Sequence, residues 1–147
     1  MSFLSSLNIG GSALTAQRFR IDVISQNIAN ADVTKTEAGT PYARKRVIMR
    51  ERGGNAEFSK LLKGGKGSDK VSLGVEIAAV EDDNADFKIV YDPEHPDADA
   101  DGNVLYPNVD KLKEMMDLMS ASQAYKANVN AINAIKTMAA AALQIGK

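Results

Sequence analysis

Apolar positions near the N-terminus recur at alternating intervals of three and four residues. They are Phe3, Leu7, Gly10, Leu14, Gln17, Ile21, Ile24, Ile28 and Ala31. A heptad spacing of this kind places side chains on one face of an α-helix. The seam from Phe3 to Ala31 therefore predicts a helix about 40 Å long, within an N-terminal helical region of residues 1–34. Gln17 interrupts this seam, either as a tolerated polar defect or as a residue that fixes register and partner number.

The C-terminal region, residues 108–147, repeats the same pattern. Its seam runs through Met115, Leu118, Ser122, Tyr125, Val129, Ile132, Lys136, Ala139 and Leu143, and Ile135 and Met138 broaden it. Asn108 and Asp110 are both suitable N-cap residues. The sequence predicts a second helix about 50 Å long.

The middle region, residues 35–107, changes to a strand period. Val71, Leu73, Val75, Ile77 and Ala79 alternate with other residues, as do Phe87, Ile89 and Tyr91. The acidic run at 81–86 is predicted to be a hairpin loop joining these two strands. Residues 42–49 are expected to form another strand, and KGGKGS at 63–68 has the composition of a flexible loop.

The predicted fold is mainly α with a small β insert. The long N- and C-terminal helices would form an antiparallel coiled-coil-like pair, with a short β-hairpin region between them. An insert of this size cannot cover both seams, so the uncovered parts would be association surfaces. We expect the terminal segments to be poorly ordered until partners complete the core.

The amino-acid composition excludes several classes of function for this chain. The chain has a formal net charge of -1, no cysteine and a single histidine, His95. Disulfides, thiolate catalysis, cysteine-based zinc sites and a His–His metal pair are thereby excluded. No apolar run reaches the ~18 residues of a membrane span. The N-terminus lacks the basic region of a secretory signal peptide, so these tests alone indicate a soluble cytoplasmic protein.

The stretch 97–108 resembles the front half of an EF-hand calcium loop. The matching residues are Asp97, Asp99, Asp101, Gly102 and Val104. The twelfth position, which needs a bidentate glutamate, is Asn108, and Pro93 and Pro96 interrupt the entering helix. A solvated acidic turn is favoured, and a calcium-binding module using Asp97–Asp101 is the alternative.

The basic run Arg44, Lys45 and Arg46 is followed by Arg50 and Arg52. It is interpreted as the charged face of a strand, or as a contact with an acidic neighbour such as another copy's 81–86 or 97–101 segment. Only Tyr42 supplies an aromatic ring nearby, so nucleic acid is not an expected partner.

Other polar groups give no evidence of an enzyme. The carboxylate pairs Glu81/Asp82 and Glu114/Asp117 lie in no pocket that the sequence defines, and are expected to be solvated. The methionines at 115, 116 and 119 are interpreted as deformable helix packing rather than a ligand site. No catalytic, cofactor-binding or metal-binding residue is predicted.

Two terminal stretches resemble a known family. SALTAQRFRIDVISQNIANADVTKT (12–36), with its Asn-Ile-Ala-Asn run at Asn27–Asn30, resembles the N-terminal signature of the bacterial flagellar axial proteins, the rod and hook family. ASQAYKANVNAINAIKTMAAAALQIGK (121–147) resembles the closing helix of that family. TPYARKRV (40–47) and YDPEHPDADADGNVLYPNVD (91–110) are similar to its proximal rod members.

The resemblance implies a structural subunit without a cofactor. Such proteins are exported by the flagellar type III apparatus without a cleaved signal peptide. They form the rod of the basal body, which crosses the periplasm, transmits motor torque to the hook and encloses the export channel. The implied partners are other copies, other rod proteins, the basal adaptor and export gate, and the export apparatus. Direct membrane insertion is not expected.

The heptads and the resemblance together imply roles for named residues. The assembly and packing residues would be Leu7, Leu14, Ile21, Ile24, Asn27, Ile28, Asn30, Tyr125, Val129, Ile132 and Ile135. Outer contacts would use Tyr42, Arg44, Lys45, Arg46, Tyr91 and Tyr106.

Overall fold

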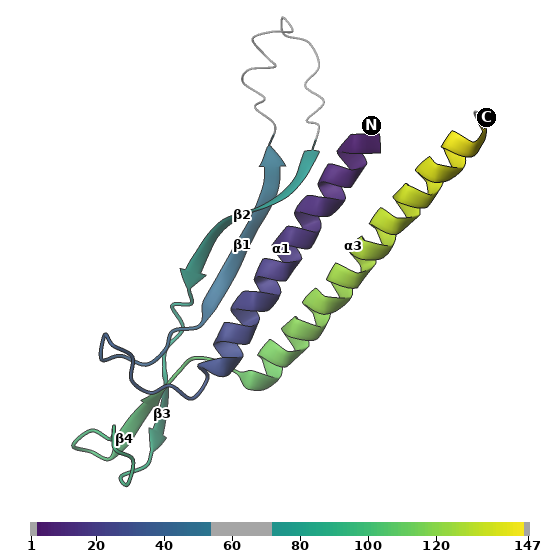
Figure 1. Ribbon diagram of the computed structural model, residues 1–147. Helices are drawn as coiled ribbons and strands as arrows, with labels where there is room; N and C mark the ends of the chain where they lie inside the picture. Colours follow the sequence, from purple (N-terminus) through teal and green to yellow (C-terminus); the bar gives the residue numbers. More distant parts are fainter. Residues whose placement is uncertain (1–2, 54–71, 146–147) are drawn as a thin grey trace, which may run out of the picture. The chain divides into compact units, whose positions relative to one another are not determined.

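A computed structural model describes residues 3–53 and 72–145 of the chain (Figure 1). Its elements, in chain order, are α1 (Phe3–Ala29), β1 (Lys45–Gly53), β2 (Ser72–Asp82), β3 (Lys88–Tyr91), β4 (Asn103–Tyr106) and α3 (Lys111–Ile145). The predicted fold class is confirmed, because two long terminal helices bracket a small β region. The loop expected at 63–68 lies outside the described residues.

The chain divides into two compact units. The first unit contains residues 1–18, 49–78 and 123–147, and the second contains residues 19–48 and 79–122. Each unit therefore holds a part of both helices and a part of the β region.

The two helices are antiparallel where the second unit pairs them. Arg20 Nη2 of α1 lies 3.5 Å from Asp117 Oδ1 of α3. Further along α1, Asn27 Nδ2 donates to Oε2 of Glu114, which lies earlier on α3. In the first unit, a Cβ placed on Gly10 of α1 would lie only 2.8 Å from Cγ1 of Ile132 of α3. The missing side chain at Gly10 permits this close approach.

The β region consists of two two-stranded sheets, β1–β2 and β3–β4. The predicted hairpin between the strands at 71–79 and 87–91 is therefore wrong. The Asp83 N–H donates to the Arg44 carbonyl at 2.6 Å, which keeps the end of β2 against the chain leading into β1. β3 instead pairs antiparallel with β4, a strand that the sequence analysis did not predict. Gly102, with φ of +79°, supplies the turn immediately before β4.

The start of α3 is fixed by Asp110 rather than Asn108. Asp110 Oδ1 accepts the backbone N–H groups of Leu112 at 3.0 Å and Lys113 at 3.3 Å, which is N-cap geometry. Neither helix, over the residues described, has a stretch long and apolar enough to cross a membrane.

The second unit has a small core with a polar centre. Its buried apolar side chains are Val23, Ile24, Ala31, Val104, Val109 and Ala121. Two polar residues are buried among them, Asn27 at 1% exposure and Glu114 at 0%. Burial of such groups costs free energy unless their hydrogen bonds are satisfied, so their partners define the site described next.

Candidate functional site

Asn27, near the end of α1, uses the full hydrogen-bonding capacity of its amide. Nδ2 donates to the Lys45 carbonyl at 2.9 Å and to Oε2 of Glu114 at 3.0 Å. Oδ1 accepts from the Tyr42 hydroxyl at 2.9 Å and from the Lys45 N–H at 3.0 Å. An amide side chain offers two donors and two acceptor positions, and all four are occupied. Asn27 therefore joins the end of α1 to the first residue of β1 and to α3.

Glu114 is a buried carboxylate with a half-buried partner. Its Oε1 accepts from Arg44 Nε at 2.7 Å, and Arg44 Nη1 donates to Asp83 Oδ2 at 3.1 Å. Burial alone would lower the pKa of Arg44, but its hydrogen bonds to Glu114 and Asp83 raise that pKa above its ordinary value. The prediction that Glu114 is solvated is wrong, because α3 turns this carboxylate inward, where Asn27 and Arg44 compensate its desolvation.

The Asn108 side chain hydrogen-bonds to two other backbone segments, at Arg44 and at Asp83–Ala85. Its Oδ1 accepts the Arg44 N–H at 2.8 Å, and its Nδ2 donates to the carbonyls of Asp83 at 2.9 Å and Ala85 at 3.0 Å. We call the connected residues the polar cluster: Asn27, Tyr42, Arg44, Asp83, Asn108 and Glu114. It holds α1, the chain before β1, the end of β2 and the start of α3 in one arrangement.

Sequence reasoning singled out Asn27, Tyr42 and Arg44 but missed the other members of the polar cluster. A usable signal existed for Glu114. It precedes Leu118 by four residues and the buried Ala121 by seven, so it lies on the inward face of α3.

The residues expected to mediate packing are distributed over both units. Ile24 and Asn27 are buried. The others are half-buried, namely Leu7, Leu14, Ile21, Ile28, Asn30, Tyr125, Val129, Ile132 and Ile135.

The residues expected to form outer contacts differ in their exposure. Arg46 and Tyr91 are exposed, whereas Lys45 and Tyr106 are half-buried. The Tyr106 ring meets the His95 ring edge-on, with 6.1 Å between the ring centroids. Tyr42 and Arg44 direct their polar atoms into the polar cluster.

One apolar helix face is uncovered in the second unit. Leu112, Met115, Met116 and Met119 are 68%, 49%, 54% and 60% exposed. Their spacing places all four on one side of α3. We call this set the methionine face. In the first unit, Phe3, Leu4, Met138 and Leu143 are also exposed.

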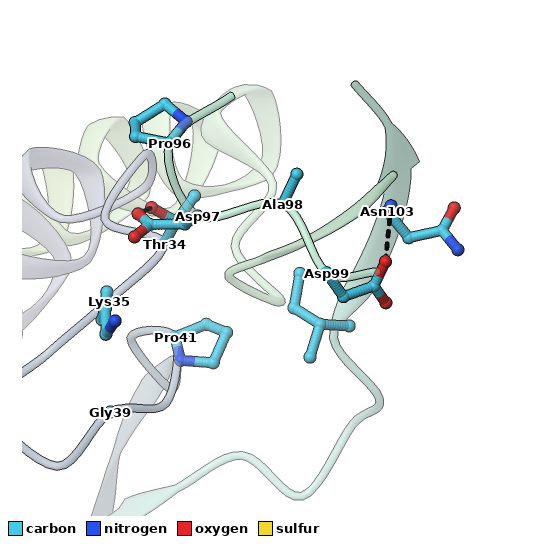
Figure 2. Close-up of a pocket in the computed structure, with 10 residues that line it drawn as sticks. Thr34, Lys35, Gly39, Pro41, Pro96, Asp97, Ala98, Asp99 and Asn103 are labelled. Atoms are coloured by element: carbon cyan, nitrogen blue, oxygen red, sulfur yellow. Dashed lines mark hydrogen bonds between the residues drawn. The ribbon is translucent and has the colours of Figure 1, made fainter. Parts of the chain in front are cut away.

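The acidic loop uses its carboxylates to stabilise turns. Residues of 34–41 and 96–105 line a pocket of about 260 Å³ in the second unit. Its lining side chains are drawn in Figure 2. Asp97 Oδ2 accepts from the Thr34 hydroxyl at 2.7 Å. Asp99 Oδ1 accepts the N–H groups of Asp101 at 3.0 Å and Asn103 at 2.8 Å. Within the described residues no group of three or more His, Asp or Glu could hold a metal ion. These contacts fit the acidic turn, and none of them supports the calcium alternative.

Gln17 has a buried Oε1 atom that finds no hydrogen-bond partner among the described residues. Both interpretations of this polar seam position are compatible with that geometry.

Comparison with known proteins gives a match at both ends of the chain. The family described as "Flagella basal body rod protein" matches residues 7–35, and "Flagellar basal body rod FlgEFG protein C-terminal" matches residues 100–145. The flagellar basal-body rod protein FlgC of Bacillus subtilis is 47% identical, with 100% of both chains covered. The FlgC proteins of Borreliella burgdorferi and Salmonella typhimurium are 42% and 37% identical, with 98–100% of each chain covered.

Proposed function

Because the chain belongs to the FlgC family of flagellar basal-body rod proteins, we propose that its terminal helices polymerise with those of neighbouring subunits to build the rod. The chain is a structural subunit of the basal body, as its resemblance to the axial proteins predicted. Torque passes through the assembled helices to the hook, and the tube that they form encloses the export channel.

The methionine face is the observation that carries this proposal. Its four large apolar side chains lie side by side in water in the single chain, although burial would stabilise them by roughly 25 cal/mol per Å². A continuous apolar stripe of this kind marks an association surface. Methionine adapts its shape to different neighbours, which suits a rod that contains more than one kind of subunit.

The seam residues supply the second part of the interface. Leu7, Leu14, Ile21, Ile24 and Ile28 would pack towards Tyr125, Val129, Ile132 and Ile135, while their remaining exposed surface meets adjacent subunits. A heterologous contact that repeats without closing produces a helical filament.

Stiffness is the property that a drive shaft requires, and the polar cluster contributes to it. Asn27 and Glu114 hold the paired helices, while Arg44 and Asn108 bind the β region to them. A load applied to that region therefore reaches the helices partly through the charge-assisted bond between Arg44 and Glu114, a type that is stronger than a neutral hydrogen bond.

We propose the following partners and location. The subunit contacts other copies, other rod proteins and the basal adaptor at the export gate. The flagellar type III apparatus exports it without a cleaved signal peptide, and its rod crosses the periplasm. It has no catalytic role, no cofactor, no nucleic-acid partner and no direct membrane insertion.

The experiment is to replace Leu112, Met115 and Met119 together by Gln in cells that lack the native subunit. These side chains are exposed, so the purified variant should keep its circular dichroism spectrum and lose less than about 1 kcal/mol of stability. Rod assembly and swimming should be lost. Lys113→Gln, an exposed substitution in the same part of α3, is the matched control and should swim normally. Motile cells with normal rods in the triple variant would contradict the proposal.

A further inference from the structure

The two faces of the β3–β4 hairpin differ in exposure, although β3 is exposed along its whole length and Val90, on the side of Val104, is 44% exposed. Ile89 pairs with Leu105, and Tyr91 pairs with Asn103. Alternation along a strand places Ile89, Tyr91 and Leu105 on the same side. They are 69%, 72% and 46% exposed, and together we call them the hairpin face. On the opposite side Val104 is buried and Lys88 Nζ donates to the Val109 carbonyl at 2.8 Å.

The loop beside the hairpin face is acidic, and Lys35 is a basic residue that lines the same pocket as Leu105, Asp97 and Asp99. The loop between the two strands exposes Glu94, Asp97, Asp99 and Asp101. Residues 89–110 contain no lysine or arginine. An anionic lipid surface or a nucleic acid would be repelled by this charge. The occupant must therefore combine apolar contact area with positive charge.

Strand β1 presents such a combination on the same chain. Its side chains alternate, so that Lys45 and Val47 are half-buried while Arg46 and Ile48 are exposed. Arg46 forms no salt bridge to any described residue, although its charge helps to lower the pKa of Asp83, whereas Arg44 is held by Glu114 and Asp83. We call Arg46 and Ile48 the strand face.

We propose that the hairpin face of one copy docks on the strand face of β1 of a second copy. Ile48 would pack against Ile89 and Leu105, while Arg46 would lie beside the carboxylates of the loop. The two surfaces differ, so the contact is heterologous and repeats from copy to copy without closing. The inference rests on the proposed function, because it requires copies of the chain to be neighbours in the rod.

The test uses the absence of cysteine from the chain. Two differently tagged variants, Leu105→Cys and Ile48→Cys, are expressed together in cells that lack the native subunit. Basal bodies are then purified and oxidised. A disulfide forms only when the two Cα atoms lie about 4.4–6.8 Å apart, so a dimer reports direct contact. We expect a reducible dimer that carries both tags and is absent when either variant is expressed alone.

Several results would overturn the inference. Motile cells without the mixed dimer would show that the two faces do not meet. A dimer from Leu105→Cys alone would mean that hairpin faces meet each other. A cross-link from Leu105→Cys to a different rod protein carrying its own introduced cysteine, with no mixed dimer, would assign the hairpin face to that protein.

Charge reversal provides a second readout if a cysteine variant fails to assemble. Arg46→Glu and Asp101→Lys should each reduce swimming, and the two changes combined in one chain should restore it. Additive losses would overturn the inference. A failure of the proposed function would give a different result. The variant in which Leu112, Met115 and Met119 are replaced by Gln would then still form normal rods.

Discussion

The side-chain amide of Asn27 pairs with both backbone groups of Lys45, donating to its carbonyl at 2.9 Å and accepting from its N–H at 3.0 Å. A neighbouring strand would offer Lys45 a similar pair of bonds. The end of α1 thus serves as the first pairing partner of β1.

Replacing Asn27 by Ala should lower the free energy of unfolding by about 3 kcal/mol. The change removes a partner from the Lys45 backbone groups, the Tyr42 hydroxyl and one Glu114 oxygen. A buried unsatisfied group costs about 1–3 kcal/mol, but only Glu114 is fully buried, and the half-buried Tyr42 and Lys45 can bond to water instead. Urea unfolding of the purified chain measures the loss. Asn30→Ala is the matched control, because among the residues that the structure describes the Asn30 amide donates only to the Gln26 carbonyl, four residues earlier. Equal losses for the two variants would contradict this role of Asn27.

Removing Glu114 alone should be more damaging than removing it together with its partner. Glu114→Met leaves the partly buried Arg44 guanidinium with only Asp83 and Asp117 as carboxylate partners among the described residues. The loss should therefore not exceed about 3–5 kcal/mol, the cost of a buried charge left without any partner. Arg44→Met/Glu114→Met should lose less than the sum of the single losses. A double-mutant cycle in urea measures this coupling, and additive losses would show that the pair is not coupled.

The control for that cycle is Arg50 and Glu76, which are joined at 2.6 Å but are 67% and 36% exposed at their side chains. Solvent screens such a pair, so its coupling should stay below about 1 kcal/mol. A coupling as large as that of Arg44 and Glu114 would mean that burial does not distinguish the two pairs.

Gly74 and Gly11 should respond to alanine in opposite directions. Gly74 has φ of +107°, and a Cβ there would overlap Oγ of Ser12, which accepts the Val75 N–H at 3.1 Å. Gly74→Ala should therefore cost at least about 2 kcal/mol through backbone strain and displacement of β2. A Cβ on Gly11 meets nothing within 4 Å, so Gly11→Ala should stabilise α1 by about 0.5–1 kcal/mol. Thermal unfolding measures both, and the same sign for both would refute the argument.

Acid should weaken the second unit partly through Asp83. The hydrogen bond from Arg44 lowers the pKa of Asp83 below its ordinary value. A carboxyl whose folded pKa is depressed stabilises the protein above its unfolded pKa, and that contribution disappears as pH falls through the folded pKa. Unfolding measured between neutral pH and strong acid should show a shallower decline in Asp83→Asn than in the native chain. Identical profiles would exclude this linkage.

Gln17→Leu separates the two interpretations of that seam position. The change removes a buried oxygen without a described partner and should stabilise the isolated chain by about 1 kcal/mol. Unchanged rods and swimming would mark Gln17 as a tolerated defect. Stable chains that assemble into irregular rods would show that it fixes register or partner number.

The helices were predictable because their signal is local and repeated. Heptad spacing over several turns of α1 and α3 does not depend on distant residues. Strand pairing was less predictable. The alternation at 71–79 and 87–91 indicates that these segments are strands, but it does not identify the strand with which each one pairs. β2 pairs with β1 across residues 54–71, and the amide of Asn108, far along the chain, helps hold the end of β2.

The polar cluster was beyond sequence reasoning for a related reason. A glutamate on a helix is ordinarily solvated, and only the three-dimensional approach of Asn27 and Arg44 makes burial of Glu114 favourable. The acidic loop was interpreted correctly as a turn, because the departures at Asn108, Pro93 and Pro96 are visible in the sequence itself.

The bond between Asn27 and Glu114 joins residues 87 positions apart. Whichever end of the chain leaves a narrow channel first, this bond cannot form until most of the other end has followed. Contacts between distant parts of a chain also form slowly, because the intervening segment must first be brought into a closed loop. If the subunit is exported as proposed, the polar cluster would therefore form only after the whole segment from Asn27 to Glu114 has left the channel.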